Sequence, residues 1–235
     1  MTEQSESGPA ADSFISKEDG LKYWEGVSPD VDGMLGGIPA VTRVDLQGSR
    51  NFLAKLGFGS KNGLRIAKRA LEGGAGIGRI TEGLLSGLAT EIDVVEPIAK
   101  FTATLEAKKI KGVHHIYTMG LEEWADLRPE PELQYDLIWV QWCVGHLTDD
   151  QLVRFFERCR AVLSAHGVIV LKENLSTTGA DAHDELDSSV TRQDETFRRL
   201  FQQAKLRLVK TDLQKGLNQA AGHQLLPVRI YALKP

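Results

Sequence analysis

The 235-residue chain has little of several features that define common protein classes. It has only two cysteines, Cys143 and Cys159, which do not make the disulfide framework of a small secreted protein. No apolar run approaches the roughly 18 residues that a membrane span needs, and no secretory signal opens the sequence. The net charge of −4 argues against a broad basic face for nucleic acid. We therefore expect a cytoplasmic protein with neither a membrane nor a nucleic-acid partner.

Apolar runs and helical patterns alternate through most of the sequence. Strands are expected near 66–71, 91–96, 113–118, 135–141 and 167–172, and helices near 77–88, 98–109, 149–163 and 191–204. This alternation predicts an α/β protein with a doubly wound, mostly parallel sheet. The last two strands, near 206–213 and 227–233, can pair as an antiparallel hairpin at the edge of that sheet.

The N-terminal part has a different composition. Residues 1–13 are rich in Ser, Glu, Ala and Pro and are expected to be a disordered tail. Residues 14–60 predict a helical extension, with helices after Ser16 and from Asp45 to Leu56. The segment 31–37 between them is too glycine-rich for a helix interior. Residues 14–235 are expected to form one domain, in which 61–235 are the α/β core.

Three glycines alternate at positions 74, 76 and 78, between a predicted strand and a predicted helix. Glycine allows a positive φ and leaves no Cβ in the way of a ligand. Arg79 occupies the last position of a dinucleotide fingerprint, which disfavours a dinucleotide oxidoreductase. The pattern instead resembles the first motif of class I S-adenosylmethionine (SAM) methyltransferases. Glu96 ends the next strand, where a carboxylate can bind both ribose hydroxyls; a solvated Glu beside a plain glycine loop is the alternative.

Polar and aromatic residues follow the predicted strand 135–141. Ligands of doubly wound sheets bind at the carboxyl ends of strands, which brings Gln141, Trp142 and His146 near the expected pocket. Trp142 offers a flat face to a proline ring or a cation. His146 can accept a proton from an amine. Its alternative role is a structural cap on the helix that begins near Thr148.

An acidic segment follows the predicted strand 167–172. It contains Asp181, Asp184, Glu185 and Asp187. Several carboxylates beside the active end of a sheet make a site for a cation. A solvated charge run that caps the next helix is the alternative.

Four segments together resemble the protein N-terminal α-N-methyltransferases: 31–37, 74–79, 141–147 and 187–190. The similarity runs from about Tyr23 to the C-terminus, and the Asp-Gly-Met-Leu-Gly-Gly and Gln-Trp-x-x-Gly-His-Leu strings are its most specific parts. With the sequence of residues 228–235, they place the chain nearest the fungal members. The resemblance implies SAM as cofactor and methylation of the α-amino group of proteins that begin X-Pro-Lys after loss of the initiator Met. It also implies ribosomal proteins among the substrates, and a nuclear as well as a cytoplasmic location.

The resemblance assigns roles to matching residues. The SAM-binding set would be Gly74, Gly76, Arg79, Glu96, Leu121, Glu122 and Gln141. The substrate-binding set would be Trp24, Leu35, Gly36, Trp142, Asn174, Asp184, Asp187 and Ser189. Asp187 and His146 would help deprotonate the amine, and Asn174 would hydrogen-bond the incoming N-terminus. No metal is implied.

Two positions depart from the family pattern. Glu72 precedes the glycine motif where relatives usually have aspartate, and Leu226 aligns with an aromatic hydroxyl that would contact the substrate. Two alternatives stay open: a class I methyltransferase for a small amine or a side chain, and an inactive SAM-binding interaction module. The pair Asp184 and Asp187 favours a peptide with a basic third residue. An intact Asn174 argues against the inactive module.

Overall fold

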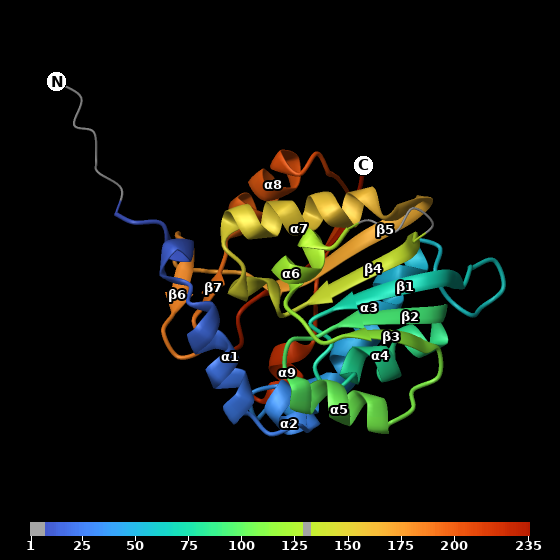
Figure 1. Ribbon diagram of the computed structural model, residues 1–235, viewed down its shortest axis with the longest axis horizontal. Helices are drawn as coiled ribbons and strands as arrows, with labels where there is room; N and C mark the ends of the chain where they lie inside the picture. Colours follow the sequence, from blue (N-terminus) through green and yellow to red (C-terminus); the bar gives the residue numbers. More distant parts are fainter. Residues whose placement is uncertain (1–7, 129–132) are drawn as a thin grey trace.

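A seven-stranded sheet in the order β3-β2-β1-β4-β5-β9-β8 organises the protein (Figure 1). The computed structural model describes residues 8–128 and 133–235. The strands are β1 Ala67–Gly73, β2 Ala89–Val95, β3 Val113–Tyr117, β4 Tyr135–Gln141, β5 Leu163–Asn174, β8 Arg207–Leu213 and β9 Val228–Lys234. Strands β1 to β5 pair in parallel, whereas β9 runs antiparallel to both β5 and β8. The doubly wound sheet and its antiparallel edge are therefore confirmed.

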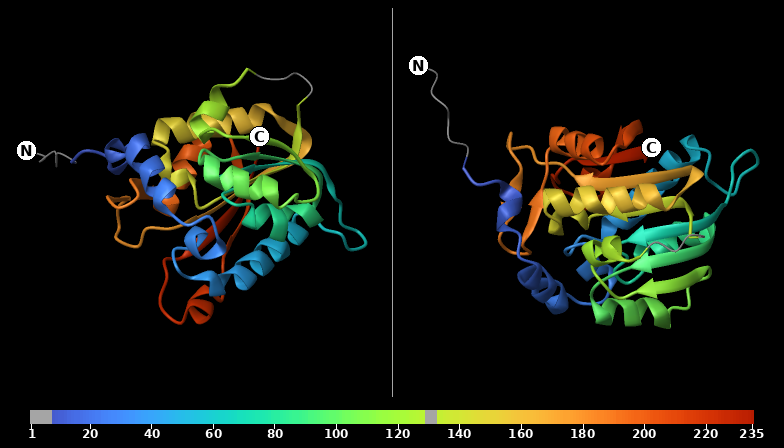
Figure 2. Two further views of the ribbon diagram at one scale, coloured as in Figure 1. Left: turned by 60° about the horizontal axis from the view of Figure 1, so that its bottom comes forward. Right: turned by 45° about the horizontal axis from the view of Figure 1, so that its top comes forward.

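Each face of the sheet carries its own helical layer and hydrophobic core (Figure 2). Helices α6 (Leu121–Asp126), α7 (Asp149–Ala161) and α8 (Asp194–Gln203) cover one face. Helices α3 (Thr42–Lys55), α4 (Arg79–Gly83) and α5 (Ala99–Ala107) cover the other. Alternation along β4 serves both layers: Ile138 and Val140 join the first core, Leu137 and Trp139 the second. Strands buried on both faces explain why these runs are almost continuously apolar.

Several short elements differ from the sequence expectation. The helix expected at 77–88 divides into α4 and a 3₁₀ turn, η3 (Leu85–Gly87), because Gly83 and Gly87 are poor helix formers. Helix α2 (Val31–Met34) occupies part of the segment considered too glycine-rich for a helix, which corrects that prediction. The Asp30 side chain caps it by accepting from Gly33 N at 2.8 Å, and Gly36, at φ 56°, follows its end.

The expected disordered tail is wrong for its last residues. Ala11–Phe14 form a 3₁₀ turn, η1, and Asp12 Oδ2 accepts a hydrogen bond from Asp149 N at 2.8 Å. A long-range contact that composition does not reveal thus orders this segment. The rest of the predicted tail, residues 1–7, lies outside the described residues.

The acidic segment forms a two-stranded hairpin, β6 (Ala182–Asp184) and β7 (Ser189–Thr191), which the sequence did not predict. Helix α6 and the short α9 (Leu217–Ala221) were missed as well. The helix expected from 191 begins only at Asp194, because β7 extends to Thr191.

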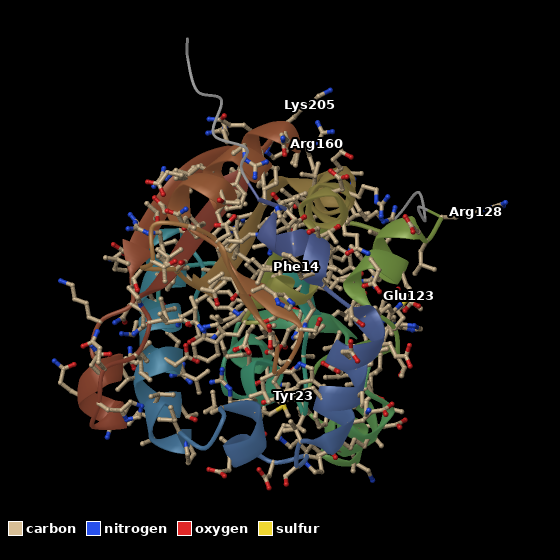
Figure 3. All side chains as sticks on the ribbon, turned by 90° about the vertical axis from the view of Figure 1, so that its left-hand side faces the viewer. Phe14, Tyr23, Glu123, Arg128, Arg160 and Lys205 are labelled. Atoms are coloured by element: carbon tan, nitrogen blue, oxygen red, sulfur yellow. The ribbon has the colours of Figure 1, made fainter. Side chains whose placement is uncertain are left out.

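The N-terminal extension crosses the carboxyl end of the sheet. Seen from that side, η1 and α1 (Lys17–Gly26) run across the foreground, with Phe14 and Tyr23 labelled (Figure 3). Ser16 N donates to Ser188 Oγ of the hairpin at 2.8 Å, and Lys17 Nζ lies 2.7 Å from Glu122 Oε1 at the start of α6. These two contacts attach the extension to the hairpin on one side of the strand ends and to α6 on the other. In the described ranges, no helix has both the length and the apolarity of a membrane span.

Candidate active site

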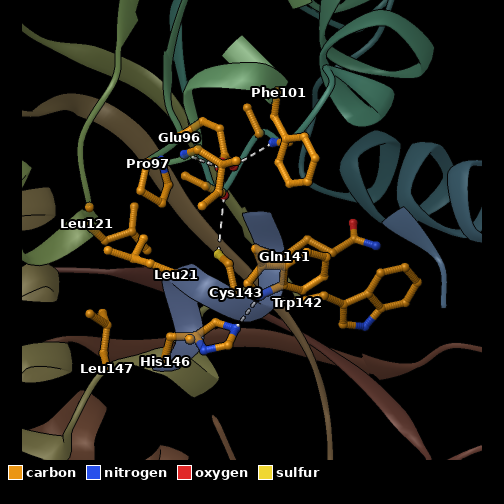
Figure 4. A pocket seen from close by; sticks show the side chains of 18 of the residues that line it. Leu21, Glu96, Pro97, Phe101, Leu121, Gln141, Trp142, Cys143, His146 and Leu147 are labelled. Carbon is orange, nitrogen blue, oxygen red and sulfur yellow. Dashed lines mark hydrogen bonds between the residues drawn. The ribbon is translucent and has the colours of Figure 1, made fainter. Parts of the chain in front are cut away.

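The main cavity opens at the carboxyl ends of β1, β2 and β4, beneath α1 (Figure 4). The order of the strands reverses between β1 and β4, and such a switch point is where open α/β sheets bind ligands. Glu96 and Pro97 lie at one side of the cavity, and His146 and Leu147 lie opposite (Figure 4). All seven predicted SAM-binding residues line it: Gly74, Gly76, Arg79, Glu96, Leu121, Glu122 and Gln141.

The glycine turn shapes one wall of this cavity. Gly74, Gly76 and Gly78 have φ values of 68°, 55° and 80°, a region that other residues rarely adopt. A Cβ at Gly74 would lie 2.4 Å from Cβ of Cys143, and one at Gly76 would lie 2.6 Å from Sδ of Met34. The backbone conformation therefore favours glycine at both positions, and the packing against Cys143 also requires it at position 74.

Glu96 closes the end of β2. Its Oε2 accepts from Gly76 N at 2.8 Å and its Oε1 accepts from Ile98 N at 2.9 Å. Burial raises the pKa of Glu96, and the two backbone N–H groups oppose that rise. Each carboxylate oxygen has a second lone pair for a further donor, so the group can bind a diol. The alternative of a solvated Glu is wrong, because the side chain is buried.

Arg79 is held in place by two neighbours. Its Nη1 lies 2.7 Å from Asp45 Oδ2, and its Cζ lies 5.4 Å from the centroid of the Trp142 ring. Asp45 also accepts from Gln141 Nε2 at 3.0 Å and from Lys172 Nζ. A cation near one end of the cavity and the Glu96 carboxylate at another fit a ligand that carries both a carboxylate and a ribose, as SAM does.

Asp45 and Lys172 were not predicted as functional residues, although each left a signal. Asp45 lies on the buried face of α3 beside Leu46 and Leu53, where a lone charge is unusual. Lys172 follows the apolar run 168–171 of β5. A charge on an apolar face indicates a buried partner, but only the fold shows which one.

Glu72, the residue that departs from the family pattern, is buried at the end of β1. Thr81 Oγ1 donates to its Oε2 at 2.6 Å. Burial raises its pKa to about 8, and the Thr81 hydrogen bond and the charge of Arg79 only partly oppose this effect. Glu72 is therefore mostly protonated at neutral pH.

A smaller cavity adjoins the main one. The two share Trp24, Trp142, Cys143 and His146. The smaller cavity adds three of the predicted substrate or catalytic residues: Asn174, Asp187 and Ser189. All three predicted catalytic residues thus line the smaller cavity, and His146 lies where the two cavities meet.

His146 is bound to the N-terminal extension. Its Nε2 accepts a hydrogen bond from Trp24 Nε1 at 2.9 Å. An indole N–H can only donate, so the neutral ring carries its proton on Nδ1. Burial lowers the pKa of His146, and the charge of Asp187 opposes this shift. His146 is not the cap of α7, because Thr148 provides that cap.

Asp187 is the better-placed proton acceptor of the pair. Its Oδ1 is buried and has no hydrogen-bond partner in the described part of the chain. A Cβ at Gly20 would lie 3.3 Å from His146 Nδ1 and 3.4 Å from the backbone oxygen of Asp187. The glycine therefore lets α1 pack closely over both catalytic candidates. Asp181 instead accepts from Gln193 N, just before α8, at 2.7 Å and does not line either cavity in the described residues.

Arg192 joins the hairpin to the segment after β4. Its buried guanidinium donates to Val144 O at 3.1 Å and to Leu147 O at 2.5 Å. Its Nε donates to Asp149 Oδ1 at 2.9 Å. This one side chain fixes β7 against η4 (Val144–His146) and the start of α7.

Three predicted substrate residues line neither cavity as the described residues define them: Leu35, Gly36 and Asp184. Leu35 packs beside Trp142 in a small apolar cluster, and Asp184 is exposed with its Oδ1 accepting from Leu186 N. Leu226 is 42% exposed. Among the described residues, no group of three or more His, Cys, Asp or Glu could hold a metal ion.

Residues 12–234 match the family described as AdoMet dependent proline di-methyltransferase. Alpha N-terminal protein methyltransferase 1 of Schizosaccharomyces pombe is 40% identical, over 92% of this chain and 95% of that protein. N-terminal Xaa-Pro-Lys N-methyltransferase 1 of Homo sapiens is 39% identical, over 86% and 89%. A solved SAM-dependent methyltransferase from Leishmania major superposes with a TM-score of 0.81 at 37% identity, covering 92% of this chain and 82% of the other.

Proposed function

The chain belongs to the AdoMet dependent proline di-methyltransferase family, and on this premise we propose that it methylates the α-amino group of proteins that begin X-Pro-Lys. The single observation that carries the proposal is the meeting of two cavities at Trp142 and His146. One cavity has the groups that SAM requires. The other has a buried, unpartnered carboxylate oxygen, on Asp187, where a substrate amine would arrive.

The cofactor cavity positions the methyl donor. SAM supplies a methyl group on a sulfonium, which an amine lone pair can attack in line. Arg79 would pair with the cofactor's carboxylate and Glu96 with its ribose hydroxyls. Leu121 and Glu122, at the start of α6, would lie along the adenine. Methyl transfer needs alignment of the two reacting atoms more than covalent help from the protein.

The second cavity prepares the amine. An α-amino group has a pKa of about 7.7–8.0, so much of it is protonated at neutral pH. Asp187 can accept that proton directly or through a water. His146 can take part only after Trp24 releases its Nε2 lone pair. Asn174 lines the same cavity and can accept a hydrogen bond from the amine through its side-chain oxygen.

The remaining features suit a short extended peptide. Trp24 and Trp142 border the two cavities and can enclose a proline ring, which loses little entropy on binding. Asp184, the last residue of β6, and Asp187, in the turn before β7, can pair with a lysine in the third position. We propose ribosomal proteins among the substrates, encountered in the cytoplasm and the nucleus.

The decisive experiment is incubation with labelled SAM and three peptides that begin Ala-Pro-Lys, Ser-Pro-Lys and Ala-Ala-Lys. Product masses count the methyl groups, and fragmentation locates them. Methylation of the first two peptides at the α-amine is expected, with little on the third. Label on a lysine side chain, or on small amines alone, would contradict the proposal.

A further inference from the structure

A buried ionic group connects the N-terminal extension to the cofactor cavity. Asp45 and Lys172 are both fully buried. Lys172 Nζ donates to the Asp45 side chain, and also to the Asp45 backbone oxygen at 3.1 Å and Ser49 Oγ at 3.0 Å. The second carboxylate oxygen of Asp45 pairs with Arg79 at 2.7 Å. Asp45 therefore stands between two cations.

One carboxylate of this group pairs with two basic side chains, since Asp45 contacts both Arg79 and Lys172. Burial lowers the pKa of Lys172, and the charge of Asp45 opposes this shift. A buried charge is costly unless it is paired. The charge of Arg79 also lowers the pKa of Glu72, but burial has the larger effect and raises that pKa to about 8, so Glu72 is mostly protonated at neutral pH. Arg79 thus shares its one carboxylate partner with a second basic group, and its positive charge can pair with a further anion.

Geometry places that charge in the main cavity. Lys172 is fully buried and does not line the main cavity in the described residues, whereas Arg79 does. A guanidinium has five N–H donors, and Asp45 occupies the Nη1 side. The face of Trp142 restricts the plane of the guanidinium further. Asp45 and Trp142 therefore orient the remaining N–H donors of Arg79 before a ligand binds.

We propose that Asp45 is a positioning residue for SAM: it orients Arg79 toward the carboxylate of the cofactor, and Lys172 holds Asp45 in place. Asp45 itself does not touch the cofactor. The inference depends on SAM as the cofactor and is independent of which amine the enzyme methylates. It gives α3 of the N-terminal extension a role in cofactor binding.

Two ligands that differ at the carboxylate test this role. S-adenosylhomocysteine carries the amino-acid end of SAM, whereas 5′-methylthioadenosine keeps the adenosine and the sulfur but lacks that end. By calorimetry, Asp45→Asn is expected to weaken S-adenosylhomocysteine about tenfold or more, the size of a lost charge-assisted contact. Binding of 5′-methylthioadenosine should change less than about threefold.

Stability must be separated from positioning, since Asp45→Asn leaves the buried Lys172 without its counter-ion. The double variant Asp45→Asn/Lys172→Met removes that cation as well and should regain thermal stability. It should not regain affinity for S-adenosylhomocysteine. Glu91→Gln serves as the matched control, because it breaks the Arg69–Glu91 pair at the opposite end of β1 and β2 and should leave both affinities unchanged.

Three results would overturn the inference. One is an Asp45→Asn protein that binds S-adenosylhomocysteine as tightly as the wild type. Another is an equal loss of affinity for both ligands, which would indicate a general disturbance of the cavity. The last is recovery of S-adenosylhomocysteine affinity in the double variant, which would make the role purely structural. Failure to methylate X-Pro-Lys peptides would affect the proposed function and leave these binding outcomes unchanged.

Discussion

In the main cavity the charged side chains already have protein partners, whereas two buried polar atoms of residues that line the smaller cavity do not. Glu96 accepts from two backbone N–H groups, and Arg79 pairs with Asp45. By contrast, Trp142 Nε1 and Asp187 Oδ1 have no partner in the parts of the chain that are described. Buried polar groups normally pair, so these two atoms are available to a ligand. We infer that the main cavity is preorganised for the cofactor and that the substrate supplies the missing partners in the smaller one.

The two cavities also differ in what builds them. Helix α1 contributes to both cavities, but the rest of the first is formed largely by strand ends and the turns that follow them. The second depends on the β6–β7 hairpin, which lies outside the main sheet. We infer that substitutions in the first region act on cofactor affinity, and those in the second on turnover and selectivity.

The largest expected effect belongs to Asp187. Asp187→Asn should lower kcat by about a hundredfold or more, the range for loss of a general base. Calorimetry should show nearly unchanged affinity for S-adenosylhomocysteine. His146→Gln should cost less, because Trp24 already engages Nε2. A pH–rate profile identical in the wild type and in both variants would remove Asp187 and His146 from the proton transfer.

Gly76→Val should have the opposite signature. A branched side chain at a φ of 55° would be strained, and its Cβ would lie 2.6 Å from Met34 Sδ. Affinity for S-adenosylhomocysteine should fall roughly a hundredfold, since strain of this kind costs about 1–3 kcal/mol and the clash adds to it. Circular dichroism should show a folded protein. Normal binding by this variant would mean that the glycine turn does not contact the cofactor.

The third residue of the peptide should have a smaller effect. Replacing its lysine with glutamine should lower kcat/KM about ten- to a hundredfold, as for loss of a charged hydrogen bond of 1.5–3 kcal/mol. Glutamate should be worse than glutamine, because it would face Asp184 and Asp187. Asp184→Lys should compress or invert the order. Equal rates on all three peptides would exclude the hairpin as the reader of charge.

The smallest effect concerns stability. The folded protein holds a proton on Glu72 that the unfolded chain releases, since the pKa rises from 4.5 to about 8. Glu72 therefore destabilises the protein progressively as pH rises from about 4.5 to 8. Glu72→Gln should gain stability relative to the wild type over this window. Urea denaturation at three pH values measures the difference between the two proteins. Burial also raises the pKa of Glu173, to about 7, but Glu173 is present in both proteins and its contribution cancels.

The sequence predicted the cofactor half better than the substrate half, for a physical reason. Apolar periodicity and the glycines at 74, 76 and 78 are local signals, and they located the sheet and the turn. Helix α2 depends on one capping side chain, Asp30, and η1 on a contact with a residue 137 positions away. Periodicity does not register such contacts.

Residue roles followed the same division. Every predicted SAM-binding residue lines the main cavity, while Leu35, Gly36 and Asp184 line neither cavity and stay predictions. The Asp45–Arg79 pair joins positions 34 residues apart. The sequence shows that Asp45 is a charged residue on an apolar helix face, but only the fold identifies Arg79 as its partner.

The buried Arg192 has a consequence for local unfolding. Because its guanidinium holds β7 to the segment that carries His146, neither can open without breaking the same hydrogen bonds. Amide hydrogens of the two segments should therefore exchange with solvent as one cooperative unit. Asp187 lies in the hairpin turn and His146 on the segment after β4, so a single opening event displaces both proposed proton acceptors at once. We expect a loss of stability confined to this unit to lower turnover at temperatures at which the sheet is still folded.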